Sequence, residues 1–443
     1  MTQTLTASDR YVSDFEAFDA SPEGQAPEWL RELRRRAIGR FREVGLPTAR
    51  KGNEPWKYTN VGPIAEQHFV RAASSVSEIP ATVPQDEGWR TLVFVDGRYA
   101  PTLSKPGDGL AVGSLKDAVA SDGENVQRHF GAHVAWEDDG FAALNTAFGV
   151  DGAFVGLAPD AVIDEPVHFI YVSSEGGEPA VSWPRTLVLA GRHSNVTLIE
   201  TYASAGQTVA NLTNAVTEIV LEDGAQVDHH RLMLENHASF HVGKTRVVQG
   251  RDTSFSSMTF EAGSALGRND FSVLLDAPGG ECHLNGLYIT TGTQHIDNYL
   301  NIDHAKPHAR SRLYYKGILD DASKAAFGGM VLVREGAMKT DAHQEDKNLL
   351  LSDEAEVDSK PSLEIYADDV ICGHGATAGA VTDEALFYMQ SRGLDEETAR
   401  VLLVQGFASE ILERVKIDSL REQLERLTLK ALPRFQGPSD DSD

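Results

Sequence analysis

The sequence predicts a mainly β protein whose long, coiled β core lies between helical segments at the two ends of the chain. Two observations predict it. Short β-type runs bounded by turn residues recur through the middle of the chain, and amphipathic helical patterns are confined to its ends. The 443 residues fit two or three domains, and a 41% share of hydrophobic residues can bury a sizeable core.

Residues 1–90 are expected to form an N-terminal helical domain. Apolar residues fall near helical spacing between Trp29 and Phe41, Pro27 can open that helix, and the glycine at position 45 can close it. The following stretch, 54–59, reads Glu-Pro-Trp-Lys-Tyr-Thr. Its composition favours a loop, and its two large aromatic side chains indicate that the loop docks onto another part of the protein.

Residues 91–380 are expected to form the β core, in which long helical patterns are nearly absent. A turn followed by a strand recurs loosely, with glycines at 191, 224 and 250 that are 33 and 26 residues apart. This spacing is too irregular for a propeller or a leucine-rich repeat, and it suits a β-helix or coiled β-solenoid with variable turns. Spacing alone does not separate a solenoid from a β-sandwich. The β-type runs that support the core are Thr91–Val95, Thr186–Ala190, Val196–Glu200 and Val216–Val220.

Residues 381–435 are expected to form a C-terminal helical domain. Thr382 can cap a short helix that Gly393 ends, and Asp395 can cap the next, longer one. The domain is small for the apolar residues it carries, so we expect it to pack on the β core or on a partner chain. Residues 436–443 are expected to form a disordered tail.

The charge and cysteine content exclude several classes of function. The net charge is −26, with 66 acidic and 40 basic residues, which disfavours binding to nucleic acid or to anionic membranes. Cys282 and Cys372 are far apart and form no disulfide framework, so we expect a reducing cytoplasm. The N-terminus does not resemble a signal peptide, and no apolar stretch is long enough to span a bilayer.

The first candidate site is Cys372-Gly373-His374. A thiol and an imidazole two residues apart, in a glycine-flanked turn, can both point outward, and they are good ligands for iron or zinc. The nearby histidine can also lower the pKa of the thiol. The alternative is a buried cysteine that acts as a small hydrophobe beside a turn histidine. From residue types alone, that alternative is favoured.

Other groupings are weaker. Cys282-His283 is a second possible ligand pair, and the remaining histidines of the β region are interpreted mostly as surface or turn residues. The acidic side chains Asp341, Glu345 and Asp346 are typical of a carbohydrate-active β-helix enzyme or a calcium site, although a solvated acidic turn is the simpler reading. No phosphate-binding loop for ATP hydrolysis is found.

Longer strings carry a resemblance to a known family. The run from Lys339 to Ser352, its continuation through 355–365, and the run 372–377 closely resemble the shared core of the SufB/SufD family of iron–sulfur cluster assembly proteins. The match is specific over residues 330–415. Within the family, 54–59 resembles the N-terminal signature of SufD-type chains, and the extra cysteines of SufB-type chains are not found. The resemblance therefore favours the SufD type.

The resemblance implies a right-handed β-helix core flanked by helical domains, in a scaffold protein that is not an enzyme. It implies a heterodimer with a SufB-like subunit, a SufC-like ATPase bound through the C-terminal helices, and a homodimer as a possible state of the isolated chain. It places a nascent, transient iron–sulfur cluster at the subunit interface, with His374 as a ligand and Cys372 as a ligand or sulfur acceptor. Reduced flavin is a further cofactor associated with such complexes.

The residue count fits this expectation. A cluster needs about four protein ligands, and this chain offers one good pair, Cys372 and His374, so the remainder would come from another subunit. Two rivals stay open. One is the carbohydrate-active enzyme, and the other is a purely structural partner in which Cys372 and His374 only pack.

Overall fold

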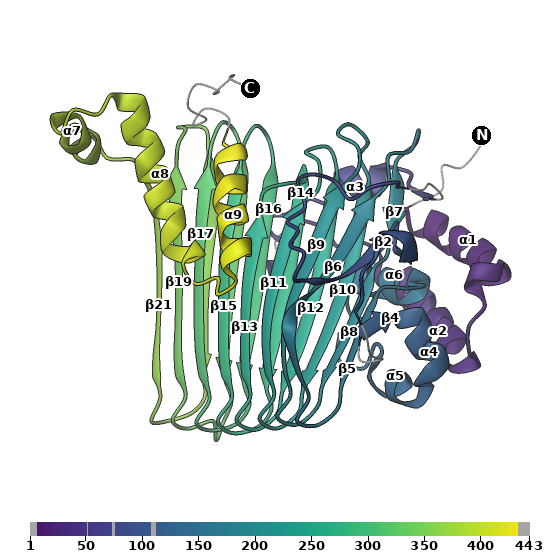
Figure 1. Cartoon of the computed structure of the whole chain (residues 1–443). Helices are drawn as coiled ribbons and strands as arrows, with labels where there is room; N and C mark the ends of the chain where they lie inside the picture. The colour runs from purple at the N-terminus through teal and green to yellow at the C-terminus, as the bar shows by residue number, and fades with distance from the viewer. Residues whose placement is uncertain (1–6, 51, 73–75, 108–111, 433–443) are drawn as a thin grey trace.

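The computed structural model describes residues 7–50, 52–72, 76–107 and 112–432. Its core is a parallel β-solenoid of about eight turns with helices at both ends (Figure 1). The predicted solenoid is therefore confirmed, and the β-sandwich alternative is wrong. The expected tail, 436–443, lies outside the described residues.

Two long sheets form the solenoid, and each turn of the chain adds one strand to each sheet. We call them sheet A and sheet B. Sheet A runs in the order β20 (Glu356–Ile365), β18 (Lys324–Val333), β16 (His295–His304), β14 (Leu266–Leu275), β12 (Phe240–Gln249), β10 (Leu212–Leu221), β8 (Arg185–Ala190), β5 (Ala153–Leu157) and β4 (Val112–Ser114), with β7 (Ala180–Ser182) pairing β10 and β1 (Val70–Arg71). Sheet B runs in the order β21 (Ile371–Ala380), β19 (Asp341–Leu350), β17 (Arg310–Leu319), β15 (Glu281–Thr290), β13 (Ser254–Glu261), β11 (Gln226–Leu234), β9 (Asn195–Ser204), β6 (Val162–Ser173), β2 (Arg90–Val95) and β3 (Arg98–Tyr99).

The strands stack in constant register, which sorts their side chains into rows. From β10 to β20 every strand of sheet A pairs residue by residue with the next, without a shift. Because side chains alternate between the two faces of a strand, each row points wholly into the solenoid or wholly outward. The inward rows of both sheets meet in one continuous apolar core.

The turns that lead from sheet A to sheet B share one backbone feature. A residue with positive φ lies two positions before each sheet B strand from β9 onward. This is the structural repeat behind the loose turn motif. Its residue types vary because several residues tolerate this conformation, glycine most readily. The seven positions are His193, Gly224, Asp252, Gly279, His308, Lys339 and Asp369.

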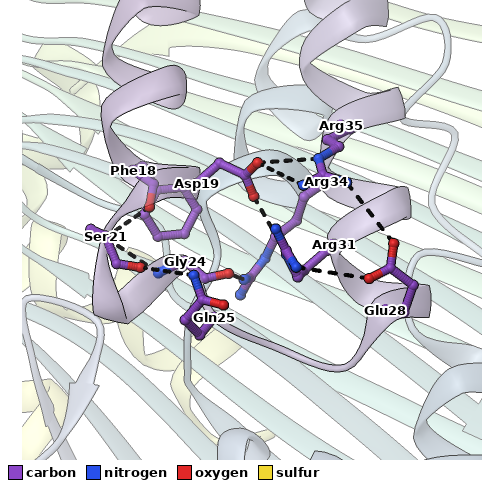
Figure 2. Close-up of polar contacts among 9 residues, drawn as sticks. All are labelled: Phe18, Asp19, Ser21, Gly24, Gln25, Glu28, Arg31, Arg34 and Arg35. Carbon is purple, nitrogen blue, oxygen red and sulfur yellow. Dashed lines mark hydrogen bonds and ion pairs between the residues drawn. The ribbon is translucent and has the colours of Figure 1, made fainter.

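The N-terminal helices α1 (Ala7–Ala20) and α2 (Glu28–Val44) form a hairpin closed by a short turn, η1 (Pro22–Gly24). Figure 2 shows how polar contacts fix this turn. Ser21 Oγ donates to the Phe18 carbonyl (2.7 Å) and accepts from the Gly24 amide (3.3 Å), and Asp19 pairs with Arg35 (3.0 Å). As predicted, α2 begins after Pro27 and ends at a glycine with positive φ.

Three short helices lie between β4 and β5: α4 (Leu115–Ser121), α5 (Gly123–His129) and α6 (Gly140–Phe148). Every residue of α6 is buried. Asn145 on α6 donates to the carbonyls of Pro184 (3.0 Å) and Asn214 (2.8 Å), which fixes the helix on the outer face of sheet A. The N-terminal end of the solenoid is thereby covered.

The Glu-Pro-Trp-Lys-Tyr-Thr loop docks as predicted, beginning with a short turn, η2 (Glu54–Trp56), and followed by α3 (Gly62–Glu66). Trp56 stacks on Phe141 of α6, with ring centroids 5.7 Å apart, and lies 4.4 Å from the guanidinium of Arg268 on β14. Thr59 donates to the carboxylate of Asp297 on β16. The loop therefore joins the N-terminal helices to the middle of sheet A.

The C-terminal helices α7 (Asp383–Ser391), α8 (Glu396–Leu412) and α9 (Asp418–Lys430) follow the last strand. Thr382 and Asp395 cap α7 and α8 as predicted. The apolar faces of α8 and α9 cover the outer face of sheet B, where Ile411 and Leu424 join the cluster that contains Leu287 and Ile318. Helix α7 stands away from the sheets in Figure 1. Among the described residues, no helix is long and apolar enough to cross a membrane.

Candidate functional site

Cys372 and His374 lie on β21, the last strand of sheet B, and not in the turn that the sequence suggested. The glycine-rich composition there does not break the strand, because β21 pairs with β19 along its whole length, from Asp341↔Ile371 to Leu350↔Ala380. The pair therefore occupies the final rung of the solenoid, beside the end of the molecule (Figure 1).

Alternation along the strand puts the thiol and the imidazole on the same side. Cys372 continues the inward row of Ala342, and His374 continues the inward row of Gln344. Residues i and i+2 of a strand are about 6.6 Å apart. Gly373, between them, faces outward. Since no strand follows β21 in the described part of the chain, its inward side chains are covered on one side only, and His374 is exposed while Cys372 is partly buried.

The surroundings of the Cys372 thiol favour its protonated form. Burial raises its pKa and the Asp341 carboxylate raises it further, which outweighs the backbone hydrogen bond from Ala342. The expectation that the adjacent histidine lowers this pKa is therefore wrong. Because a thiol must lose its proton to bind a metal, Cys372 would become a ligand only when an incoming ion or partner replaces the proton.

A groove of about 550 Å³ runs beside the site along the outer face of sheet B. Gly373 and Gly375 leave its floor open, and the outward-facing residues Arg312, Tyr314 and His343 line it. Asp341 accepts from Arg312 (2.7 Å) and lies 3.1 Å from the ring of His343. Within the described parts of the chain, no three His, Cys, Asp or Glu side chains converge as a metal site. The open end of the solenoid offers one thiol, that of Cys372, and one imidazole, that of His374.

Cys282 and His283 do not form a second ligand pair. They point to opposite faces of β15, and Cys282 is fully buried in the same inward row as Cys372, three strands away, or about 14 Å. Burial raises the pKa of its thiol strongly. Cys282 is a core residue.

The acidic residues do not converge either. Asp341 and Glu345 lie on the outward face of β19, whereas Asp346 points inward and is buried. Ser359 Oγ and Asn348 Nδ2 donate to Asp346 at 2.6 and 2.7 Å. Two carboxylates on opposite faces of a sheet cannot flank one glycosidic bond, so Asp346 cannot act together with Asp341 or Glu345 in that way.

The interpretation of the β-region histidines as surface residues is wrong for several of them. His229 is buried and lies 3.1 Å from the Glu200 carboxylate, His230 is buried, and His304 is buried against Ser311. His308 does lie in a turn, with positive φ. The buried histidines lie at strand positions that other parts of the protein cover. The sequence around each of them does not show that it will be covered.

Sequence reasoning missed the apolar surface around the site. Ile371 on β21, Ile365 at the end of β20 and Tyr366 directly after that strand are exposed at the solenoid end. A single exposed apolar side chain is unremarkable, but several at an open sheet edge mark an association surface. Only the tertiary structure shows that they lie together.

Comparisons with known proteins agree with this architecture. Residues 170–407 match the family model described as SUF system FeS cluster assembly, SufBD core domain, and residues 5–169 match the SufBD protein N-terminal region. An iron–sulfur cluster assembly SufBD family protein of Synechocystis is 30% identical, over 84% of this chain and 85% of its own. The assembly protein SufD of Escherichia coli is 29% identical over 93% of each chain.

A more distant relative, SufD of Bacillus subtilis, is 24% identical over 95% of this chain and 97% of its own. The similarity thus spans the helical ends as well as the β core, and the family core model includes the strand that carries Cys372 and His374. On these matches, the chain belongs to the SufB/SufD family of iron–sulfur cluster assembly proteins.

Proposed function

We propose that this chain is the SufD-type subunit of an assembly scaffold and that its open solenoid end, with Cys372 and His374, forms half of the site where a cluster is built. The observation that carries the proposal is the last rung. Two ten-residue strands, β20 and β21, end sheets A and B with no further strand beyond them in the described residues. Unpaired edges of this length call for a partner.

The ligand count supports a shared site. A cluster needs about four protein ligands, and this end presents a partly buried thiol and an exposed imidazole on the inward face of β21. A SufB-like chain docked end to end would cover that face and supply the missing ligands. Iron and sulfide are the cargo of this site. The same open end offers a second copy of this chain a docking surface, which would give a homodimer of the isolated subunit.

The C-terminal helices offer a separate surface for an ATPase subunit of the SufC type. Helix α7 buries only Leu386, and its Phe387 is 72% exposed beside the exposed Tyr388. Aromatic residues of this kind are common anchors in protein interfaces. A reduced flavin bound within the complex stays a prediction from the family resemblance, as does a cytoplasmic location.

The test is anaerobic reconstitution of the complex co-expressed with its SufB-like and SufC-like partners. We expect His374→Ala to lower the amounts of bound iron and acid-labile sulfide. The control is His343→Ala on the neighbouring strand β19, whose side chain faces outward; it should leave both amounts unchanged. Gel filtration first establishes that each complex is intact. Full cluster loading in an intact His374→Ala complex would rule out the ligand role.

A matched cysteine pair separates the ligand role from a packing role. Cys372→Ala should lower cluster loading, whereas Cys282→Ala, in the same inward row but fully enclosed, should alter thermal stability and leave loading unchanged. Normal loading in a Cys372→Ala, His374→Ala double variant would instead support a purely structural subunit.

A further inference from the structure

A second cleft of about 550 Å³ lies on the opposite sheet, between the N-terminal segments and the outer face of sheet A. Its floor consists of two parallel rows of outward side chains that cross β12, β14 and β16. Pro55 and Trp56 of the docked loop, together with residues 133–135 and 138–140 at and before the start of α6, form its walls. The rows are Lys244, Asp270 and Tyr299, and Arg246, Ser272 and Asn301.

The carboxylates of this cleft are already neutralised. Asp139 accepts from Lys244 (2.7 Å) and from the α6 amide of Ala142 (2.9 Å). Asp270 lies 3.6 Å from the Lys244 ammonium and 3.8 Å from the Arg268 guanidinium. Asp138, on the rim, pairs with Arg40 at 3.3 Å. The acidic side chains of the cleft therefore have cationic partners within the protein.

Arg246 is the exception. Among the described residues it makes no hydrogen bond or ion pair, although its Nε atom is buried. Burial lowers the pKa of its guanidinium, with the carboxylate of Asp303 opposing the shift. A buried donor without a hydrogen-bond partner is unfavourable, because it has lost its contact with water. In a chain of net charge −26, a cation left unpaired in a cleft is the expected complement of an anionic ligand.

Asn301 supplies a second unmet group in the same row. Its Oδ1 atom is buried and has no hydrogen-bond partner. An amide oxygen accepts hydrogen bonds, so it complements a hydroxyl group. The cleft thus contains the Arg246 guanidinium and, two strands away in the same row, the unpaired acceptor Asn301 Oδ1. Its volume suits a small molecule.

We propose that this cleft binds a small oxyanion, a carboxylate or a phosphate, that also carries a hydroxyl group. The Arg246 guanidinium receives the oxyanion, and Asn301 Oδ1 accepts the hydroxyl hydrogen. Because the docked loop forms one wall and sheet A the floor, a bound ligand would contact both the N-terminal region and the solenoid. The site is separate from the open end that carries Cys372 and His374.

The test is isothermal titration of the purified full-length chain with inorganic phosphate, citrate and tricarballylate, which is citrate without its hydroxyl group. We expect phosphate or citrate to bind the wild-type protein, and Arg246→Gln to weaken binding about tenfold or more, as loss of a charge-assisted bidentate contact would. Arg334→Gln is the matched control, because Arg334 is already paired with Asp303. Unfolding curves should be similar for both variants.

The hydroxyl contact has its own test. Citrate should bind more tightly than tricarballylate to the wild-type protein, and Asn301→Ala should abolish that difference. Binding of phosphate alone identifies a phosphate-bearing ligand, and binding of citrate alone identifies a hydroxycarboxylate. The proposal is overturned if none of the three anions binds, or if Arg246→Gln binds as tightly as the wild type.

Discussion

The two ends of the solenoid differ in how they are closed. At the N-terminal end, β3 pairs antiparallel with β2 and β4 antiparallel with β5, and helices α4–α6 cover the strands behind them. At the C-terminal end, β20 and β21 are left as full-length edges (Figure 1). A solenoid needs a cap wherever its stacking stops. The described residues supply such a cap for the first rungs and none for the last rung.

The two open edges also differ from each other. Strand β20 carries Glu356, Lys360 and Pro361, the charged and proline residues that discourage unwanted strand pairing. Strand β21 contains no Asp, Glu, Lys or Arg and reads Ile-Cys-Gly-His-Gly-Ala-Thr-Ala-Gly-Ala. The edge that carries the candidate ligands is therefore the less protected one, as expected of a strand built to be covered.

The largest expected effect tests the closed end. Arg185 on β8 pairs with Glu218 on β10 at 2.5 Å, and both are buried under α6. Arg185→Met leaves Glu218 as an uncompensated buried charge, so we expect a loss of about 3–5 kcal/mol in the free energy of unfolding. Urea unfolding measures it, with Arg310→Met, which breaks the exposed pair with Glu281, as the control. If Arg185→Met and Arg310→Met cause equally small losses of stability, the buried ion pair beneath α6 does not help to hold the closed end together.

The next effect concerns Asp346, inside the next-to-last rung of sheet B. Burial raises its pKa to about 6, against hydrogen bonds from Ser359, Asn348 and Tyr288 that lower it. Because the folded pKa lies above the unfolded value, its contribution to stability is full below pH 3.8 and is lost as the pH rises through 6.

Asp346→Asn removes that titration. The stability of the variant relative to the wild type should therefore increase by up to about 3 kcal/mol between pH 4 and pH 7. Urea unfolding at a series of pH values measures the difference. A difference that does not change with pH would show that Asp346 titrates as an exposed carboxyl does.

A smaller effect tests the open end. Ile371 on β21 is 65% exposed, and Val162 on β6, near the covered end, is 60% exposed. We expect Ile371→Asp to weaken association with the SufB-like subunit about tenfold or more, without changing the melting temperature of the isolated chain. Val162→Asp should change neither. Titration with the partner and light scattering measure the association of each variant. If Ile371→Asp and Val162→Asp have the same effect, the interface is not at the open end.

The smallest effect concerns the link between the docked loop and the last rung. Glu54 pairs with Lys360 on β20 at 2.7 Å, and both side chains are about half exposed. Exposed ion pairs contribute little to stability, so Glu54→Gln should leave the melting temperature unchanged. A clear decrease would mean that this loop, and not strand pairing alone, holds β20 in place.

The sequence by itself determined the kind of architecture. Short β-type runs bounded by turn residues predicted the coiled β core, and Thr382, Asp395 and Pro27 predicted where helices begin, because β-type runs, turns and caps are local properties of the chain. Helix α6 gave no such signal. All its residues are buried, so it lacks the polar face that makes a helical pattern visible.

The tertiary structure alone decided how the candidate site is built. Cys372 and His374 share a face because residues 371–380 form a strand that pairs with β19, where the sequence suggested a turn, and alternation along β19 puts Asp346 and Asp341 on opposite faces. The turn repeat was hidden for a related reason: backbone conformation, not residue identity, recurs at positions such as His193 and Lys339. Which row faces inward, and which end stays open, depends on neighbours far along the chain, and no local pattern encodes it.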